Sequence, residues 1–270
     1  MRTNWIRLVT CLPVLALLVC GVGIARSEGA TASAEKTKVL LVTGGHDFEK
    51  EPFLAMFKTM DSIELETAEH KETSEAYDRD LSKYDVLVLY DMAQKITDAQ
   101  KKNLLKFLQS GKGLVVLHHA LGSYQDWLDY QKIVGGKFFT ADRTEDGVEH
   151  EKSTWKHDVK TNVKIADKSN PIVKGMSDFQ ILDEVYGNYL VRPNVKPLLT
   201  TNHPLSEKVI AWTHLCGKAP VAYIQLGHGA SAFKDSNYRK LVSNAIAWAG
   251  GRLAPQKATA PAPAPRRGGG

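Results

Sequence analysis

The chain has 270 residues, of which 43% are hydrophobic and 24% are charged, and its formal net charge is +5. The excess positive charge lies at the two ends. Residues 1–34 carry three basic residues and one acidic residue, and residues 254–270 carry three basic residues and no acidic one. The remaining core, residues 35–253, is therefore neutral and lacks the basic surface expected of a nucleic-acid-binding protein.

Residues 1–34 have the pattern of a secretory signal peptide. Arg2 and Arg7 precede an apolar run, Leu8–Ile24, and alternating alanines follow it as in a cleavage site. We therefore expect a periplasmic or secreted protein without membrane attachment after signal cleavage. Two alternatives stay open. One is an uncleaved membrane anchor, and the other is lipidation of Cys20, which follows a weak lipoprotein-like box.

The core is long enough for one domain, and the C-terminal tail is not part of it. Residues 254–270 are rich in alanine and proline and end in Arg-Arg-Gly-Gly-Gly, so we predict a disordered tail that buries no apolar surface. About 220 residues remain in 35–253, which is ample for a single hydrophobic core. Cys216 is the one cysteine outside the signal, which excludes an intramolecular disulfide in the mature protein.

In the first half of the core, short apolar runs alternate with segments of helical periodicity. The helix ending at Ser110 has Thr97 as its N-cap and Gly111 just beyond its C-terminus. This alternation predicts a parallel sheet with helices on both faces. The predicted strands are Lys38–Thr43, Ile63–Ala68, Asp85–Tyr90 and a short apolar run that ends at His118. The predicted helices are Phe48–Met60, Thr97–Ser110 and a segment through Trp127 and Tyr130.

After about Gly135 the pattern changes to strands joined by turns such as Cys216-Gly217-Lys218. This favours antiparallel pairing before a final helix, Asn237–Ala249, packs back on the sheet. The predicted strands are Thr154–Ile165, Lys196–Thr201, Lys208–Trp212 and Val221–Gln225. The fold class is thus α/β, a three-layer α/β/α domain with a mostly parallel sheet extended by antiparallel strands.

Three histidines, His46, His118 and His228, each follow an apolar strand directly or after a glycine turn. Ligands bind beyond the carboxyl ends of the strands in such sheets, so we expect the three imidazoles to converge in one pocket. Imidazoles there can transfer protons or hold a divalent metal such as zinc. The long spacing has no H-x-x-x-H element, so a metal remains one alternative beside a loop hydrogen bond. Of the adjacent pair, His118 is the one expected to face the pocket, with His119 toward the flanking loop.

Further candidates are polar and aromatic side chains near these strand ends. Asp183, Glu184 and Tyr186 could supply a base, a metal ligand or an acceptor for sugar hydroxyls, unless they form a solvated turn at the start of a helix. Trp127 and Tyr130 share one helical face and either stack on a sugar ring or pack in the core. No G-x-S-x-G and no nucleotide-binding glycine motif is present, and Cys216 lies in a turn, so nucleophilic catalysis and nucleotide binding are unsupported.

Four segments in the same order resemble the ThuA-like family, named for trehalose utilisation, within the class I glutamine amidotransferase-like superfamily. The resemblance extends over the core from Val39 to Arg252. It is carried by Gly113-Leu-Val-Val-Leu-His118, Trp127-x-x-Tyr130-x-x-x-Val-Gly-Gly-x-Phe138, Asp183-Glu184-Val-Tyr186, and Tyr223-Ile-Gln-Leu-Gly-His228 followed by Asn244-Ala-Ile-Ala-Trp248-Ala.

The resemblance implies a flavodoxin-like sheet in which His118 stands where amidotransferases carry their catalytic cysteine and His228 lies near the place of their histidine. Without the cysteine, glutaminase activity is not expected. The family is associated with sugar catabolism, especially of oxidised (3-keto) disaccharides, which implies a small-molecule carbohydrate as the partner.

The leading hypothesis is an exported enzyme that acts on a disaccharide or a 3-keto-glycoside as a hydrolase or lyase. Two alternatives stay open: a non-catalytic periplasmic carbohydrate-binding domain, and a metal-dependent hydrolase with zinc on His46, His118 and His228. No other cofactor is expected. The predicted catalytic residues are His118, His228 and Glu184, and the predicted substrate-binding residues are His46, His119, Trp127, Tyr130, Asp183 and Tyr186.

Overall fold

The computed structural model describes residues 35–253. The predicted signal peptide, 1–34, and the predicted tail, 254–270, lie outside these residues. Within the described part of the chain, no helix combines the length and the apolar character needed to cross a membrane.

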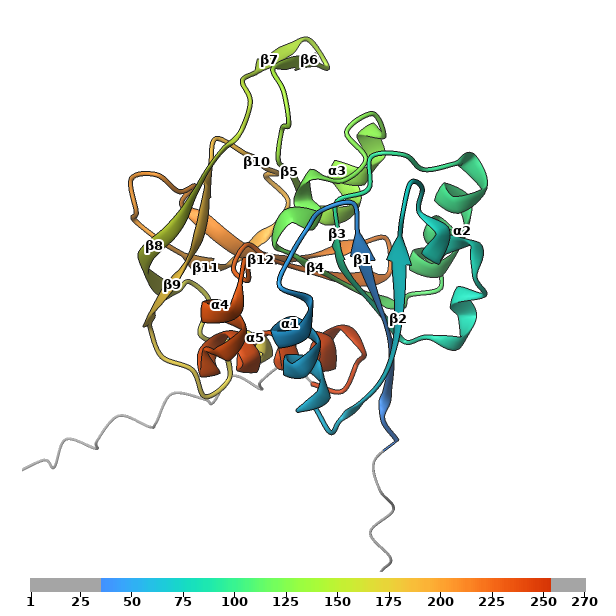
Figure 1. Ribbon diagram of the computed structural model, residues 1–270, viewed down its shortest axis with the longest axis horizontal. Coiled ribbons are helices and arrows are strands. Elements are labelled where there is room, and N and C mark those ends of the chain that lie inside the picture. Colours follow the sequence, from blue (N-terminus) through green and yellow to red (C-terminus); the bar gives the residue numbers. More distant parts are fainter. Residues whose placement is uncertain (1–34, 254–270) are drawn as a thin grey trace, which may run out of the picture. The chain divides into compact units, whose positions relative to one another are not determined.

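A mixed nine-stranded sheet forms the centre of the domain, in the order β2-β1-β3-β4-β13-β12-β11-β8-β9 (Figure 1). The strands from β2 to β13 in this order are parallel to one another, and every pairing from β13 to β9 is antiparallel. Their bounds are β1 (Thr37–Gly44), β2 (Ile63–His70), β3 (Val86–Asp91), β4 (Gly113–Leu117), β8 (Thr154–Ile165), β9 (Phe179–Gly187), β11 (Lys196–Thr200), β12 (Val209–Cys216) and β13 (Ala219–Ile224).

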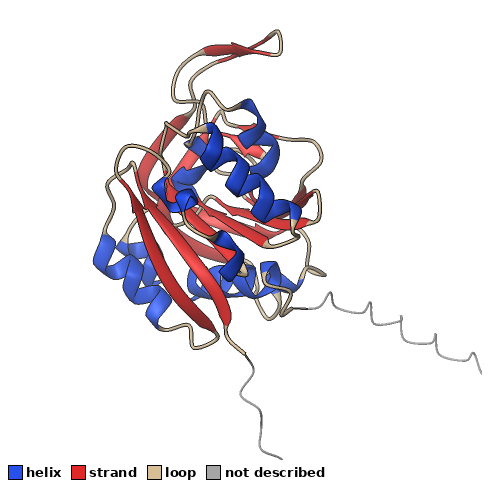
Figure 2. Cartoon of the chain, turned by 90° about the vertical axis from the view of Figure 1, so that its right-hand side faces the viewer, coloured by secondary structure: helices blue, strands red, loops and turns tan. Residues whose placement is uncertain are grey.

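Helices cover both faces of the sheet, which confirms the predicted three-layer α/β/α class (Figure 2). Successive strand residues point to opposite faces, so in β1 Val39 and Leu41 join one core cluster and Leu40 and Val42 the other. The helices α1 (Lys50–Lys58), α4 (Ala230–Lys234) and α5 (Ser236–Ala249) pack on the first cluster, and α2 (Asp98–Gln109) and α3 (Leu128–Val134) on the second.

Smaller elements complete the described chain. Two short pairs lie outside the main sheet: β5 (Gly136–Lys137) with β10 (Leu190–Val191), and β6 (Arg143–Glu145) with β7 (Val148–His150). Single turns of 3₁₀ helix occur at Glu75–Asp78, Leu81–Lys83, His118–Gly122 and Pro171–Val173.

Most predicted elements are present, with shifted ends. The helix predicted from Phe48 begins at Lys50, and the Cys216-Gly217-Lys218 turn joins β12 to β13 as expected. The reading of Asp183 and Glu184 as a solvated turn is wrong, because both residues lie buried within β9. Their neighbours Phe179–Leu182, which look like an isolated apolar segment in the sequence, are the first half of that strand.

The N-terminus of α2 offers a test of local stability. Thr97 Oγ1 accepts the N–H of Gln100 at 3.2 Å, and the Gln100 side chain accepts the N–H of Thr97 at 3.0 Å, which together form a capping box. We expect Thr97→Ala to lower the free energy of unfolding by about 1 kcal/mol in urea denaturation, since a backbone donor loses its partner. Thr97→Ser keeps the hydroxyl and should retain most of that stability. Equal losses in the two variants would contradict the assignment.

Candidate functional site

The site lies at the carboxyl ends of the parallel strands. His46 follows β1, His118 and His119 follow β4, and His228 follows β13. These strands run in the same direction, so their carboxyl ends share one edge of the sheet. Glu184 comes from β9, the last strand in the sheet order. Because Glu184 nevertheless contacts His118, the antiparallel half of the sheet curls back over the end of β4.

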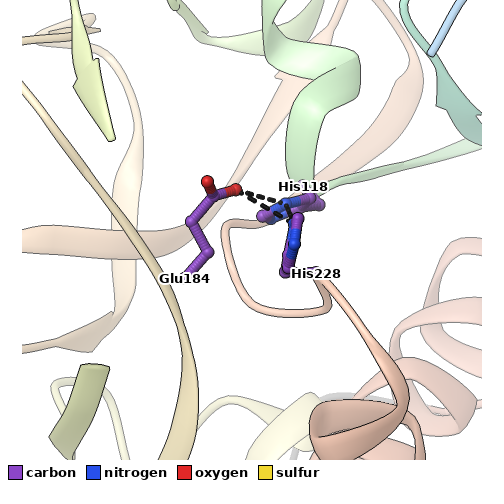
Figure 3. Close-up of side chains that lie close together, drawn as sticks. All are labelled: His118, Glu184 and His228. Carbon is purple, nitrogen blue, oxygen red and sulfur yellow. Dashed lines mark hydrogen bonds and ion pairs between the residues drawn. The ribbon is translucent and has the colours of Figure 1, made fainter. Parts of the chain in front are cut away.

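Three side chains converge on one point (Figure 3). Glu184 Oε2 lies 3.0 Å from His118 Nε2 and 3.2 Å from His228 Nδ1. The two ring nitrogens lie 3.3 Å from each other. Among the described residues, these are the group whose donor atoms are arranged to hold a metal ion.

His118 is held rigidly at the end of β4. Its backbone has φ of 51°, in the left-handed region that non-glycine residues rarely adopt, so the chain turns sharply here. The ring Nδ1 donates to the carbonyl of Gln225 at 2.6 Å, and the Tyr186 hydroxyl lies 2.8 Å from Nε2. The ring of Tyr186 also stacks on that of His118 at 4.8 Å. These contacts leave His118 1% exposed and fixed in orientation.

Asp183 positions the loop that carries His228. Its carboxylate accepts the backbone N–H of Gly227 at 2.7 Å and that of His228 at 2.9 Å. With both oxygens bound to backbone and the residue buried, Asp183 does not line the cleft. The prediction that Asp183 binds substrate is therefore corrected, because its role in this geometry is to hold the backbone of the loop.

The electrostatics of the cluster favour an ionised carboxylate. Burial alone would raise the pKa of Glu184, but hydrogen bonds from His118 and His228 lower it well below its ordinary value. In turn the hydrogen bond to Glu184 raises the pKa of His228, against the opposing effect of burial. Glu184 and His228 thus form a charge-assisted pair at the floor of the site.

His157 is a site residue that the sequence did not reveal. Its Nδ1 lies 3.2 Å from Glu184 Oε1, the oxygen that His118 and His228 leave unused. The pairing of β8 with β9 is interrupted between Lys156 and Val159, and Asp158 has φ of 56°. Such a bulge changes the direction of the side chains beside it. The regular alternation of 154–165 in the sequence contains no signal of the bulge.

The cluster opens into a cleft of about 310 Å³ that is partly aromatic. Trp155, which the sequence analysis did not single out, is 54% exposed and lies beside His157 with ring centroids 4.7 Å apart. The cleft is lined by His46, Met92, His119, Phe138, Thr140, Lys152, Trp155, His157, Glu184, Tyr186 and His228. An aromatic wall next to titratable groups is suited to a small polar ligand with apolar ring faces.

His46 and His119 lie in the cleft but outside the three-residue cluster. The expectation that His118 faces the pocket and His119 turns away from it is wrong, because His119 lines the cleft whereas His118 is buried beneath it. Their rings stack at 4.6 Å, and His119 Nε2 lies 3.2 Å from the carbonyl of Tyr90. Burial lowers the pKa of His119 well below its ordinary value, so this ring is neutral at physiological pH. Of the metal-ligand candidates His46, His118 and His228, the structure brings the last two together with Glu184, and His46 lies outside this group.

The predicted aromatic platform of Trp127 and Tyr130 is also wrong. Tyr130 is 2% exposed and donates its hydroxyl hydrogen to the carbonyl of Ala120 at 2.8 Å. Trp127 packs against the same core cluster, and neither residue lines the cleft. Trp127 lies just before α3 and is half-buried, whereas Tyr130 lies within the helix and is buried among apolar side chains, which removes its ring from water.

Comparisons with known proteins agree with the fold. The family model described as ThuA, trehalose utilisation, matches residues 38–249. A ThuA-like protein from Parabacteroides merdae has a TM-score of 0.71 at 18% identity, covering 83% of this chain and 93% of its own. A ThuA-like protein from Bacteroides uniformis has a TM-score of 0.61 at 20% identity, with coverage of 82% and 94%.

A cytoplasmic protein from Salmonella typhimurium is also similar, with a TM-score of 0.54 at 14% identity and coverage of 78% of this chain and 98% of its own. At these identities the likeness concerns the fold alone. No functionally curated protein matches the sequence.

The Glu184–His228 pair predicts a pH-dependent contribution to stability. The pKa of Glu184 in the folded protein lies below its ordinary 4.5, so its stabilisation is complete above pH 4.5 and is lost at lower pH. The pKa of His228 lies above its ordinary 6.5, so its stabilisation is complete below pH 6.5 and is lost as the pH rises through the raised value.

We therefore expect the difference in unfolding free energy between wild type and His228→Gln to be largest between pH 4.5 and 6.5. The measurement is urea denaturation across the pH range with EDTA present, to exclude metal ions. A difference that does not change with pH would show that the pair contributes no charge interaction.

Proposed function

This chain belongs to the ThuA family, described as trehalose utilisation, and from that membership together with the histidine–carboxylate cluster we propose that it acts on a disaccharide or a 3-keto-glycoside in its cleft. The observation that carries the proposal is the double contact of Glu184 with His157 and His228. One carboxylate orients two imidazoles through their Nδ1 atoms, side by side in a cleft with an aromatic wall.

Two oriented imidazoles supply an acid and a base. Because Nδ1 of each ring faces Glu184, each Nε2 is left to exchange protons with a bound molecule. The ring centroids of His157 and His228 are 4.3 Å apart, so both can reach the same substrate. His118 is buried and bonded at both nitrogens, which makes it a fixed part of the floor and not a mobile proton carrier.

A 3-keto substrate suits this arrangement because the ketone acidifies the neighbouring C2–H bond. A histidine Nε2 removes the C2 proton, the C–H electron pair forms a C1=C2 double bond, and the glycosidic C1–O bond breaks. The leaving oxygen takes its electron pair and a proton from the second histidine. The products are an unsaturated keto-sugar and the free alcohol, with one proton moved from carbon to oxygen. No nucleophile is required.

Hydrolysis of an unoxidised glycoside is less compatible with the site. Glycosidases of the common type place two carboxyl groups on opposite sides of the scissile bond. Here Glu184 is the one carboxylate that lines the cleft among the described residues, because Asp183 is held by the loop backbone. The geometry therefore favours elimination over paired-carboxylate hydrolysis.

Trp155 is the side chain best placed to stack on a sugar ring, since it is exposed and lies next to His157. In this proposal Trp155 has the sugar-stacking role that the sequence analysis predicted for Trp127 and Tyr130. We further propose that the protein is exported, because residues 1–34 carry the basic, apolar and small-residue segments of a secretory signal.

The test is product release from a panel of plain and 3-keto disaccharides, measured with mature protein. Turnover confined to the keto-sugars is the expected result. Turnover of plain disaccharides alone would contradict the elimination chemistry. Tight binding without turnover of any member would contradict the enzyme proposal and favour a carbohydrate-binding protein.

Two substitutions separate proton transfer from sugar binding. We expect His157→Asn to lower kcat by roughly 100-fold or more with little change in KM, because a positioned base is lost. Trp155→Ala should raise KM by about tenfold, equivalent to about 1.4 kcal/mol, and leave kcat largely intact. His203→Asn, which changes a histidine outside the cleft, is the control. An unchanged kcat in His157→Asn would exclude this residue as the base.

A further inference from the structure

We propose that the point between His118 Nε2, Glu184 Oε2 and His228 Nδ1 is a binding site for one divalent transition-metal ion, zinc in the first instance. The inference deepens the proposed function, on which its catalytic part rests, by assigning an ion to the same cleft. The site itself depends only on the chemistry and spacing of these three side chains.

His118 Nε2 can serve as a metal ligand at this point. A carbonyl oxygen only accepts, so the 2.6 Å contact with Gln225 requires a hydrogen on His118 Nδ1. Nε2 is then the nitrogen that can bind an ion, and it lies 3.0 Å from Glu184 Oε2 and 2.8 Å from the Tyr186 hydroxyl. The Tyr186 hydroxyl would give up this contact when Nε2 binds an ion.

A single hydrogen between these three atoms would satisfy only some of their contacts. A hydrogen on His118 Nε2 would satisfy the contact with Glu184 but would also face His228 Nδ1 at 3.3 Å. One metal ion can accept a lone pair from each of the three atoms at once.

The spacing of the three atoms fits coordination. Zinc binds imidazole nitrogen and carboxylate oxygen at about 2.0–2.2 Å, so two ligand atoms in a tetrahedral site lie about 3.3 Å apart. The three observed separations are 3.0, 3.2 and 3.3 Å. Small shifts of the side chains would therefore be enough to admit the ion.

Each ligand is also supported from behind. A histidine that binds a metal through one ring nitrogen commonly donates the hydrogen on its other ring nitrogen to a backbone carbonyl. His118 makes this contact with the carbonyl of Gln225. Glu184 Oε1 is held by His157 at 3.2 Å, and the backbone of His228 is held by Asp183. Such contacts orient ligands before the ion arrives.

The donor set indicates the class of metal and its role. Two imidazoles and one carboxylate suit zinc and its transition-metal neighbours, whereas calcium and magnesium prefer oxygen ligands alone. Three protein ligands leave a coordination position, and because Glu184 and His228 line the cleft, an oxygen of water or sugar could occupy it. Because His228 Nδ1 then serves the ion, proton abstraction falls to His157, which is bound to the other oxygen of Glu184.

The test is zinc binding by untagged mature protein, without any sugar. Protein is freed of metal with EDTA, and zinc chloride is then added while bound metal and the melting temperature are measured. We expect one zinc ion per chain and a rise in melting temperature that follows zinc concentration. Cobalt chloride in place of zinc should give visible absorption bands of a nitrogen- and oxygen-coordinated ion.

Variants assign the ligands. Glu184→Gln and His228→Gln should weaken zinc binding beyond the roughly 10- to 100-fold typical of losing a hydrogen-bond partner of a ligand. They should also abolish the zinc-dependent rise in melting temperature. His46→Gln, in the same cleft, and His203→Gln, outside it, should bind zinc like wild type. His118→Asn adds a third ligand test if it folds, as judged by circular dichroism.

The absence of stoichiometric zinc, or equal binding by wild type and both ligand variants, would overturn the inference. Loss of zinc in His46→Gln would also overturn it, in favour of a three-histidine site. Failure of the proposed function gives a different result. In that case zinc binds as described, but no keto-sugar is turned over. Full turnover in EDTA would show that the reaction does not use the ion.

Discussion

The carboxylate of Glu184 is the interaction on which the site depends. It receives His118 and His228 on one oxygen and His157 on the other. These four residues come from the end of β4, the loop after β13, the bulged strand β8 and the strand β9. A single buried charge therefore connects the parallel and antiparallel halves of the sheet, and the desolvation cost of that charge is offset only while its histidine partners stay in place.

The two halves of the sheet contribute different parts of the cleft. The parallel half brings histidines to one edge, because each strand ends in a glycine turn or a sharp elbow just before the ring. The antiparallel half curls over this edge and supplies the carboxylate, the extra histidine and the exposed tryptophan. Neither half contains a complete site, so the chemistry proposed above requires the curl of β8 and β9.

The sharp turn at His118 is a backbone geometry that could expose a nucleophile, but in this chain it carries an imidazole. A left-handed residue after a buried strand holds its side chain over the sheet edge, where a nucleophile would be well exposed. Here an imidazole occupies the position and is bonded on both nitrogens. The solved ThuA-like structures, at 18% and 20% identity, share the fold. The reaction and the substrate therefore depend on this chain's own side chains.

The sequence by itself determined the layers of the fold and the strand-end histidines. Periodicity separates strands from helices, and parallel strands bring their carboxyl ends to one edge whatever their order. Tertiary structure alone decided which residues meet there. Trp127 and Tyr130 have the spacing of one helical face, but only tertiary packing showed that Tyr130 is buried and that Trp127, just before α3, packs against the core. Trp155 and His157 lie in a regularly alternating segment, and the bulge that turns them to the cleft depends on pairing with β9, a contact between distant parts of the chain.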